Sequence, residues 1–456
     1  MQLIHEGKVR DLYVAPQSNN ILVDVLLYEI GRNLGYSAAE RVTVSVCVLV
    51  FFWGAFAFVA AASRRPPWLL APALAMVAYG YTFEMGFLNY YLSIGLAFFG
   101  IAAVWQGAFK DWIAAAVIAV LAFLAHPIGL LVMIAFITYV KLSQLTQGWK
   151  RWIPPALALA VLIAIHFYIL RFQTMVWETP FFRMNGSDQL MLYGRRYYAL
   201  GLALLAFMVG AIGYGLIRER ALYRLIRDEA GGTSASIRIA LELWGVLLVS
   251  AALIPEVIYM PQYPAPVALL VARSTCISAV LGVCVIGCLQ PRRWHMVGFG
   301  LGAAILFTWL YQDTGRLNKL EEQGRRMVNA FPYGTRFVVT IGPAIGSRIA
   351  YICHILDRAC LGRCFTYSNY EPSSGQFWIH SRPGSRTADS NADEILALEF
   401  GQYRVKAADL PLKQIYQCSV EDVDRLCIRD LAAGEQNCPN CNNPLYRAMH
   451  AAAAKR

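Results

Sequence analysis

Long apolar stretches fill most of the chain between residues 41 and 312, and they constrain the fold more than any other feature. The hydrocarbon core of a bilayer is about 30 Å thick, so a helix that crosses it needs about 20 mainly apolar residues. Charged residues make up 15% of this chain, whereas soluble domains carry about 25%. We therefore predict a mainly α polytopic membrane protein with about ten transmembrane helices. These cover residues 41–62, 67–82, 87–107, 112–126, 127–141, 152–172, 197–217, 239–259, 267–289 and 294–312.

Lysine and arginine gather in the loops on one side of these ten segments. They are Arg64, Arg65, Lys110, Lys141, Lys150, Arg151, Arg218, Arg220, Arg224, Arg227, Arg238, Arg292 and Arg293. The positive-inside rule places these loops in the cytoplasm. The predicted location is the bacterial cytoplasmic (inner) membrane, with residues 1–40 and 313–456 extracytoplasmic. The net charge of +11 comes without a basic stripe of interleaved aromatic residues, so we expect the lipid bilayer, and no nucleic acid, as the partner of these charges.

Residues 1–40 carry the pattern of an amphipathic helix. Apolar residues recur at helical spacing between charged ones, at Ile21, Val23, Leu26, Leu27, Ile30 and Leu34. Such a helix is expected to lie on the membrane surface. Because this acidic segment is predicted outside with no apolar segment before it, we expect the full-length gene to encode a further hydrophobic helix upstream.

The region after residue 312 is predicted to be a small disulfide-containing α/β domain. Helical spacing covers residues 313–330 and 347–359, and strand-like runs cover residues 335–342, 375–380, 402–407 and 413–418.

Seven of the eleven cysteines lie in this C-terminal region, which suits an oxidising compartment. Their spacing offers three local disulfide candidates: Cys360 with Cys364, Cys418 with Cys427, and Cys438 with Cys441. Cys353 is then left over, although sequence alone does not fix connectivity. A zinc site at Cys438 and Cys441 would need a second well-spaced pair of ligands that the sequence lacks. We therefore predict no metal site there.

Ionisable and amide side chains inside or beside the apolar segments are the candidate functional residues, because such groups are costly in a membrane. The set is Glu84, Asn89, His126, His166, Glu242, Glu256 and Arg273. All but Glu242 fall near the predicted outer ends of their helices, which predicts a polar cavity that opens outward. His126 precedes Pro127, which removes a backbone donor and marks either a tight hairpin or a single broken helix.

Structural roles compete with the functional reading at these positions. Glu84, Asn89 and the neighbouring tyrosines also suit an interfacial aromatic belt. Glu256 and Arg273 could pair and hold two helices together, and His166 could form an interhelical hydrogen bond.

Three stretches together suggest a family. "SNNILVDVLLYEIGRNLGYSAAERV" (18–42), "GFLNYYLSIGLAFFGIAAVW" (86–105) and "LAFLAHPIGLLVMIAF" (121–136) resemble bacterial integral-membrane glycosyltransferases of the C superfamily, including the protein O-mannosyltransferase-like group. The resemblance covers about residues 1–312. It implies transfer of a sugar from a polyprenyl-phosphate donor to a glycan or lipid acceptor at the outer membrane face.

The resemblance also implies an acidic residue in the first outer loop that assists the acceptor or a divalent cation. The chain departs from the family here, because its early acids are Glu6 and Asp11 and neither lies in a recognisable motif. The catalytic residue is thus unassigned, and the protein is expected to be either incomplete or an inactive relative. Arg195, Arg196 and Arg273 are candidates for the leaving phosphate, because developing negative charge favours cationic partners.

Two other classes of function fit the same sequence. A multi-span transporter would use the polar residues as a substrate path, although the sequence shows no convincing internal repeat. A non-catalytic envelope scaffold would use the C-terminal domain as its working part.

Overall fold

The protein consists of two compact units. The computed structural model describes residues 2–177, 185–218, 232–261, 266–340, 348–349, 355–367, 369, 371–385, 394, 397–398, 401–419 and 424–438. The unit that we call the sheet unit comprises residues 1–17, 261–265 and 308–456. The unit that we call the helical unit comprises residues 18–260 and 266–307.

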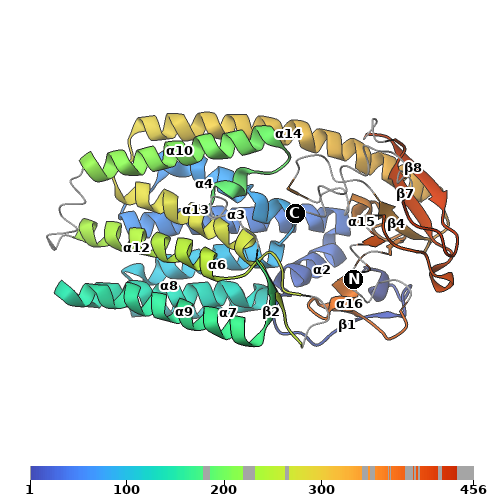
Figure 1. The fold of residues 1–456 in the computed structure, drawn as a ribbon, viewed down its shortest axis with the longest axis horizontal. Coiled ribbons are helices and arrows are strands. Elements are labelled where there is room, and N and C mark those ends of the chain that lie inside the picture. Colours follow the sequence, from blue (N-terminus) through green and yellow to red (C-terminus); the bar gives the residue numbers. More distant parts are fainter. Residues whose placement is uncertain are drawn as a thin grey trace. The chain divides into compact units, whose positions relative to one another are not determined.

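The helical unit is built from helices of very different lengths (Figure 1). They are α2 (Leu22–Leu34), α3 (Tyr36–Ser63), α4 (Ala71–Ala78), α5 (Tyr81–Glu84), α6 (Leu88–Trp105), α7 (Phe109–Ala125), α8 (Pro127–Leu145), α9 (Ile153–Phe172), α10 (Arg195–Arg218), α12 (Gly232–Leu253), α13 (Leu270–Cys288) and the start of α14 (Arg293–Asn329). Short elements complete it: η1 (Trp68–Leu70), η2 (Gly148–Trp152), η4 (Ser187–Leu190), and the antiparallel pair β2 (Thr174–Val176) and β3 (Val257–Tyr259).

Eight helices within the described ranges are long and apolar enough to cross a bilayer. Seven are α3, α6, α8, α10, α12, α13 and α14. The eighth is the stretch Gly148–Phe172, which contains η2 and α9. The chain is thus a multi-pass membrane protein. The two other predicted spans coincide with shorter elements: residues 67–82 break into η1, α4 and α5, and residues 112–126 lie in the 17-residue helix α7. The total of ten spans stays a prediction.

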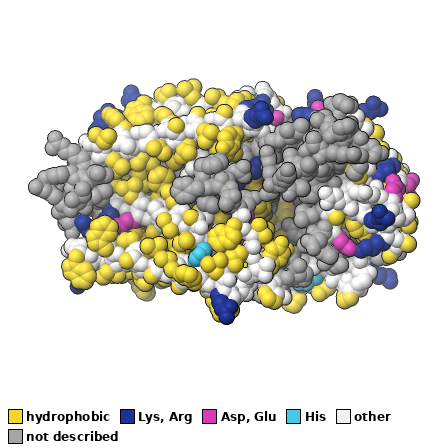
Figure 2. All heavy atoms as spheres, in the orientation of Figure 1, with side chains coloured by type: hydrophobic (Ala, Val, Ile, Leu, Met, Phe, Trp, Pro, Cys, Tyr) yellow, Lys and Arg dark blue, Asp and Glu magenta, His cyan; other side chains and the backbone are white. Residues whose placement is uncertain are grey.

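The helices differ in how much of their apolar surface the unit itself covers. Nearly every residue of α13 is buried among its neighbours. In contrast, α9 leaves large apolar side chains exposed, among them Leu157, Ile163 and Phe167. Hydrophobic side chains gather over the helices on the face shown in Figure 2. Proteins in water rarely expose such continuous apolar surface. We therefore infer that these side chains contact lipid.

Helices α3 and α6 approach each other closely at two glycines. A Cβ atom at Gly54 would overlap the carbonyl group of Gly95, and one at Gly95 would lie 2.7 Å from the Cα atom of Phe51. The Phe51 ring stacks on that of Tyr91 beside this contact, with ring centroids 4.3 Å apart. Membrane helices associate largely through such packing at small residues.

The motif His126-Pro127-Ile128-Gly129 forms the corner between α7 and α8. His126 is extended, and its Nδ1 atom accepts a hydrogen bond from the backbone N–H of Ile128 at 3.2 Å. Pro127 begins α8, where no intrahelical backbone donor is needed. The Ser93 hydroxyl lies 2.8 Å from the carbonyl oxygen of His126, and a Cβ atom at Gly129 would overlap this hydroxyl.

Helix α8 returns along α7 after this corner. Lys141 and Gln144, near the end of α8, donate hydrogen bonds to the carbonyl oxygen of Trp105, just before α7 begins, at 3.3 and 3.0 Å. Of the two arrangements that the sequence allowed, the hairpin is therefore the one formed.

A four-stranded mixed sheet organises the described part of the sheet unit. Its strand order is β5-β4-β7-β8, with β4 parallel to β5 and to β7, and β7 antiparallel to β8. The strands are β4 (Arg336–Thr340), β5 (Phe365–Thr366), β7 (Lys413–Gln417) and β8 (Leu426–Asp430). Phe337, Val339 and Ile415 from the strands share one apolar core with Leu320 and Val328 of α14. The other elements are α1 (Gln2–His5), β1 (Leu12–Val14) paired with β6 (Ile379–Ser381), α15 (Ile355–Ala359), α16 (Glu371–Ser374) and η5 (Ala407–Asp409).

The secondary structure predicted for this region is confirmed in part. Of the helix predicted at 313–330, residues 313–329 lie within α14, and the runs 335–342 and 413–418 contain β4 and β7. The strand predicted at 402–407 is wrong, since Arg404 forms only an isolated bridge to Gln436. The strand predicted at 375–380 overlaps β6 only at its end, and the helix predicted at 347–359 is described as α15 from Ile355 onward.

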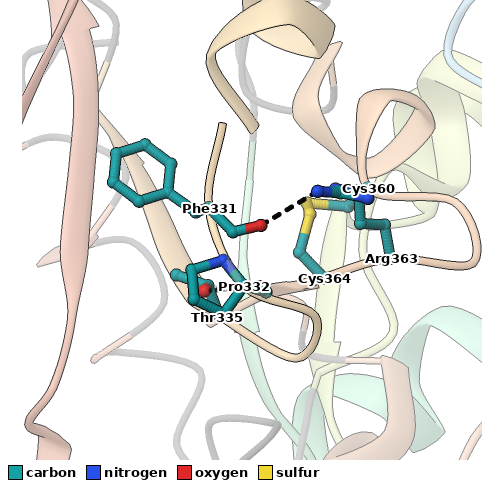
Figure 3. The surroundings of a disulfide bond; sticks show 6 residues. All are labelled: Phe331, Pro332, Thr335, Cys360, Arg363 and Cys364. Atoms are coloured by element: carbon teal, nitrogen blue, oxygen red, sulfur yellow. Dashed lines mark hydrogen bonds between the residues drawn. A yellow bond between two sulfur atoms is a disulfide. The ribbon is translucent and has the colours of Figure 1, made fainter. Parts of the chain in front are cut away.

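Two of the three disulfide candidates are formed. Cys360 is bonded to Cys364, and Cys418 is bonded to Cys427. Figure 3 shows the first pair, beside which the Arg363 guanidinium donates to the carbonyl oxygen of Phe331 at 3.0 Å. Cys438 is also disulfide-bonded. Cys441 and Cys353 lie outside the described residues.

Gly54→Ala is expected to destabilise the helical unit, because the added methyl group must displace the backbone of α6. Overpacking of this kind costs about 1–3 kcal/mol, so the Tm in detergent should fall by a few degrees. Gly210→Ala in α10 is the matched control, because a Cβ atom there meets open space. Equal Tm values for the two variants would contradict the close approach of α3 and α6.

Candidate functional site

Arg273 stands at the centre of a cation–aromatic cluster at the start of α13. Its guanidinium carbon lies 4.6 Å from the centroid of the Phe87 ring and 5.7 Å from that of Tyr90. Its Nε atom donates to the carbonyl oxygen of Leu269 at 3.1 Å, and Nη2 donates to that of Ala268. These contacts hold a positive charge against aromatic faces at the end of the helical unit, where cation–π attraction stabilises it.

His126 joins this cluster through Tyr90. The two rings meet edge to face with centroids 5.5 Å apart. Because Nδ1 of His126 accepts from the backbone N–H of Ile128, the neutral ring carries its proton on Nε2. The structure thus brings together two residues, His126 and Arg273, that are 147 positions apart in the sequence.

Glu84 lies at the end of α5 and pairs with a tyrosine from a distant segment. The hydroxyl of Tyr193 donates to Oε2 of Glu84 at 2.5 Å. Burial raises the pKa of Glu84 above its ordinary value, although the hydrogen bond from Tyr193 opposes this effect. A carboxyl group with a raised pKa is a candidate for proton exchange nearer to neutral pH.

Asn89 anchors the amphipathic helix α2 to the start of α6. Its side-chain carbonyl accepts from the backbone N–H of Val23 at 2.9 Å, and its amide donates to Oδ2 of Asp24 at 3.2 Å. Burial raises the pKa of Asp24. The predicted helix in residues 1–40 is thus present as α2, and Asn89 acts as its attachment point.

Glu256 caps the start of α13, a structural role different from the pairing with Arg273 that the sequence suggested. Its Oε2 atom accepts hydrogen bonds from the backbone N–H groups of Val271 and Ala272, at 3.1 and 3.3 Å, in the first turn of α13. A carboxylate in this position satisfies donors that a helix start leaves unpaired and interacts favourably with the helix dipole. Glu256 therefore fixes the helix end that carries Arg273.

The other predicted residues lie away from the Arg273 cluster or serve packing. His166 contacts the carbonyl oxygen of Leu253 through Nδ1 at 2.8 Å and thereby links α9 to α12. Arg195 and Arg196 are exposed at the start of α10, and Arg196 lies over the ring of Tyr197. Glu242 accepts from the hydroxyl of Tyr139 at 2.9 Å.

The early acids Glu6 and Asp11 belong to the sheet unit. Glu6 forms an ion pair with Lys8 at 2.6 Å, and Asp11 accepts a hydrogen bond from the Ser385 hydroxyl at 2.9 Å.

A buried polar network beside the cluster was missed by sequence reasoning. Gln189 accepts from the hydroxyl of Thr82 at 3.0 Å and donates to that of Thr275 at 2.7 Å, while the Thr275 hydroxyl also lies 2.6 Å from Oδ2 of Asp188. The Thr82 hydroxyl reaches the backbone carbonyl of Arg273 at 3.1 Å. The only sequence signal was the polar run "NGSDQL" before α10, which resembled an ordinary loop.

Within the described part of the chain, no group of three or more His, Cys, Asp or Glu side chains is placed to hold a metal ion. Comparisons with family models, curated proteins and solved structures give no match to this chain.

Glu84→Gln is expected to remove a pH dependence of stability. The pKa of Glu84 is raised in the folded state, so between the ordinary and the raised value the folded state binds more protons than the unfolded state. Stability then falls as the pH rises through this window. The variant should gain Tm over the wild type at neutral pH, and this gain should shrink toward pH 4.5. Glu29→Gln, at an exposed position of α2, is the control for the loss of a carboxyl group outside the buried contact with Tyr193. A pH-independent difference for Glu84→Gln would contradict this expectation.

Glu256→Ala is expected to destabilise the start of α13, since two buried backbone donors lose their acceptor. The cost of such a loss is about 1–3 kcal/mol, whereas Glu256→Gln keeps one acceptor oxygen and should cost less. Hydrogen exchange of the amides of Val271 and Ala272 is the direct measurement. Unchanged protection in Glu256→Ala would show that the cap is dispensable.

Proposed function

We propose that the protein is a membrane glycosyltransferase-like protein that binds a polyprenyl-phosphate-linked sugar at the outer face of a bacterial cytoplasmic membrane. The observation that carries this proposal is the Arg273 guanidinium, held against the rings of Phe87 and Tyr90 where α13 begins and α6 begins. A cation at the end of a membrane helix is placed for a lipid phosphate, and its aromatic surroundings suit the adjoining apolar chain.

Arg273, Glu84 and His126 each have a part in the proposed chemistry. As the acceptor oxygen bonds to the anomeric carbon of the sugar, the bond between that carbon and the phosphate breaks. Negative charge then grows on the leaving phosphate, and the fixed guanidinium stabilises it. The Glu84 carboxyl, paired with Tyr193, is the proposed proton-exchanging group for the acceptor hydroxyl. His126 fixes the corner of α7 and α8 and offers its Nε2–H as a donor to the ligand.

The proposed position of Arg273 at the outer face rests on the distribution of basic residues. These favour a cytoplasmic position for the helix ends opposite to Arg273. The polar residues that lie near Arg273 are concentrated at one end of the helical unit. This placement favours ligand binding at one face over a polar path through the membrane, as a transporter would require.

Arg273→Gln is expected to weaken binding of a polyprenyl-phosphate sugar at least tenfold. Loss of one charge-assisted contact corresponds to about 1.5–3 kcal/mol, and 1.4 kcal/mol is a factor of ten. The probe is a farnesyl-phosphate mannose that carries a diazirine, and the measurement is photo-crosslinking to the full chain in nanodiscs. Arg273→Lys should retain part of the binding.

Arg293→Gln is the matched control, because this exposed arginine lies at the far end of the membrane helices. It should crosslink as the wild type does. Equal crosslinking of Arg273→Gln and wild type, or labelled peptides that all lie far from α6 and α13, would overturn the proposed function.

A further inference from the structure

A second cationic feature lies at the other end of the membrane helices, about 22 Å along α6 from Tyr90 at 1.5 Å per residue. It is a cavity of about 370 Å³ between the ends of α3, α6, α8 and α12. Its lining residues are Arg64, Trp105, Gln106, Gly107, Lys141, Gln144, Ala235, Ser236 and Ile239. Sites for small ligands in proteins commonly have volumes of about 300–1,000 Å³, so the cavity has room for a small polar group.

The lining of this cavity, which we call the basal cavity, is positive. Arg64 and Lys141 line it, and no acidic side chain is among its nine described lining residues. Two described acids on neighbouring helices have other partners. Asp111 accepts from the backbone N–H of Ala108 at 2.7 Å and caps α7. Glu242 of α12 accepts from Tyr139 of α8 and forms an ion pair with Arg238 of α12.

Neutral hydrogen-bonding groups accompany the two cations. Gln106, with its side-chain carbonyl toward Arg64, accepts from Nε of Arg64 at 2.7 Å and so orients the guanidinium. The ammonium group of Lys141 and the amide of Gln144 both reach the carbonyl oxygen of Trp105, at 3.3 and 3.0 Å. Together with the hydroxyl of Ser236, these groups give the basal cavity several hydrogen-bond donors, which is the chemistry that a phosphate group requires.

Exposed apolar side chains follow the lining residues of the basal cavity closely in the sequence. Phe109 and Trp112 follow its lining residue Gly107, and Leu145 follows Gln144; all three are exposed. The Lys141 ammonium lies 5.8 Å from the centroid of the Trp112 ring. Aromatic and apolar side chains beside lysine at helix ends are typical of the headgroup level of a bilayer. A ligand there would meet a cationic polar cavity on one side and acyl-chain contacts on the other.

We propose that the basal cavity binds the phosphate group of an anionic phospholipid. The phosphate contacts Arg64 and Lys141, and the acyl chains lie against Phe109 and Leu145. Cationic pockets between membrane helices on the cytoplasmic side are suited to such headgroups. A free phosphate ion shares the headgroup's chemistry but would gain nothing from these apolar side chains. This inference does not depend on the function proposed above.

Native mass spectrometry of the full chain, released from mixed detergent and lipid, tests the proposal. The probes are phosphatidylglycerol and phosphatidylcholine. The wild type should retain one phosphatidylglycerol molecule more than the double variant Arg64→Gln/Lys141→Gln, and should show no such excess of phosphatidylcholine. The double variant Lys150→Gln/Arg293→Gln removes the same two charge types from exposed positions outside the cavity and should behave as the wild type. Equal retention in the two double variants overturns the proposal.

A gain-of-binding variant keeps the test decisive if the first double variant folds poorly. Gln144→Lys adds a cation to the basal cavity and keeps a donor for the carbonyl oxygen of Trp105, so retention of phosphatidylglycerol should rise several-fold. Unchanged or lower retention counts against the proposal. The last experiment is competition with inorganic phosphate at millimolar concentration. If it displaces phosphatidylglycerol only weakly, the lipid source is supported; if phosphate binds and the lipid does not, the lipid source is wrong.

Discussion

Hydrocarbon offers no hydrogen-bond partners, and this constraint governs the helical unit. Every backbone N–H or C=O group left unpaired where a helix begins, ends or breaks must find a partner within the protein. The corner at His126 and Pro127 meets this requirement with the imidazole Nδ1 atom, which accepts from Ile128, and with the Ser93 hydroxyl. The start of α13 meets it with the carboxylate of Glu256. Polar side chains therefore sit where helices begin and end, and the candidate site is assembled from the same positions.

This constraint separates residues that the sequence presented as one set. Glu256 and His166 complete backbone hydrogen bonding, and Asn89 holds α2. Arg273 and Glu84 differ from them, because their contacts position a charge or a titratable group at the end of the unit. A polar residue at membrane depth therefore supports a functional hypothesis only when hydrogen bonds to nearby backbone groups do not already explain its position.

The long apolar segments, the strands at β4 and β7 and two disulfides could be predicted, because hydropathy, β-branched runs and short cysteine spacing are local signals. The break between α4 and α5 could not. Residues 67–82 are apolar enough to suggest one span, yet a Cβ atom at Gly80 would lie 3.1 Å from the side chain of Gln189, so a distant segment packs into the break. The network of Asp188 and Gln189 escaped prediction for the same reason, since its partners lie on α5 and α13. The predicted strand at 402–407 failed because Arg404 finds only one bridging partner, at Gln436.

The two ends of the membrane helices place their cations in different surroundings. At the start of α13 the guanidinium of Arg273 faces aromatic rings and is fixed by backbone carbonyls. In the basal cavity, Arg64 and Lys141 lie with the amides of Gln106 and Gln144 and the hydroxyl of Ser236, and Lys141 also lies over the ring of Trp112. Aromatic faces stabilise a cation without neutralising it, so its charge remains available to an anionic ligand. Hydrogen-bonding walls favour a compact headgroup whose oxygens are all paired. These different surroundings are the basis of the two proposals, a lipid-linked sugar phosphate at one end and a phospholipid phosphate at the other.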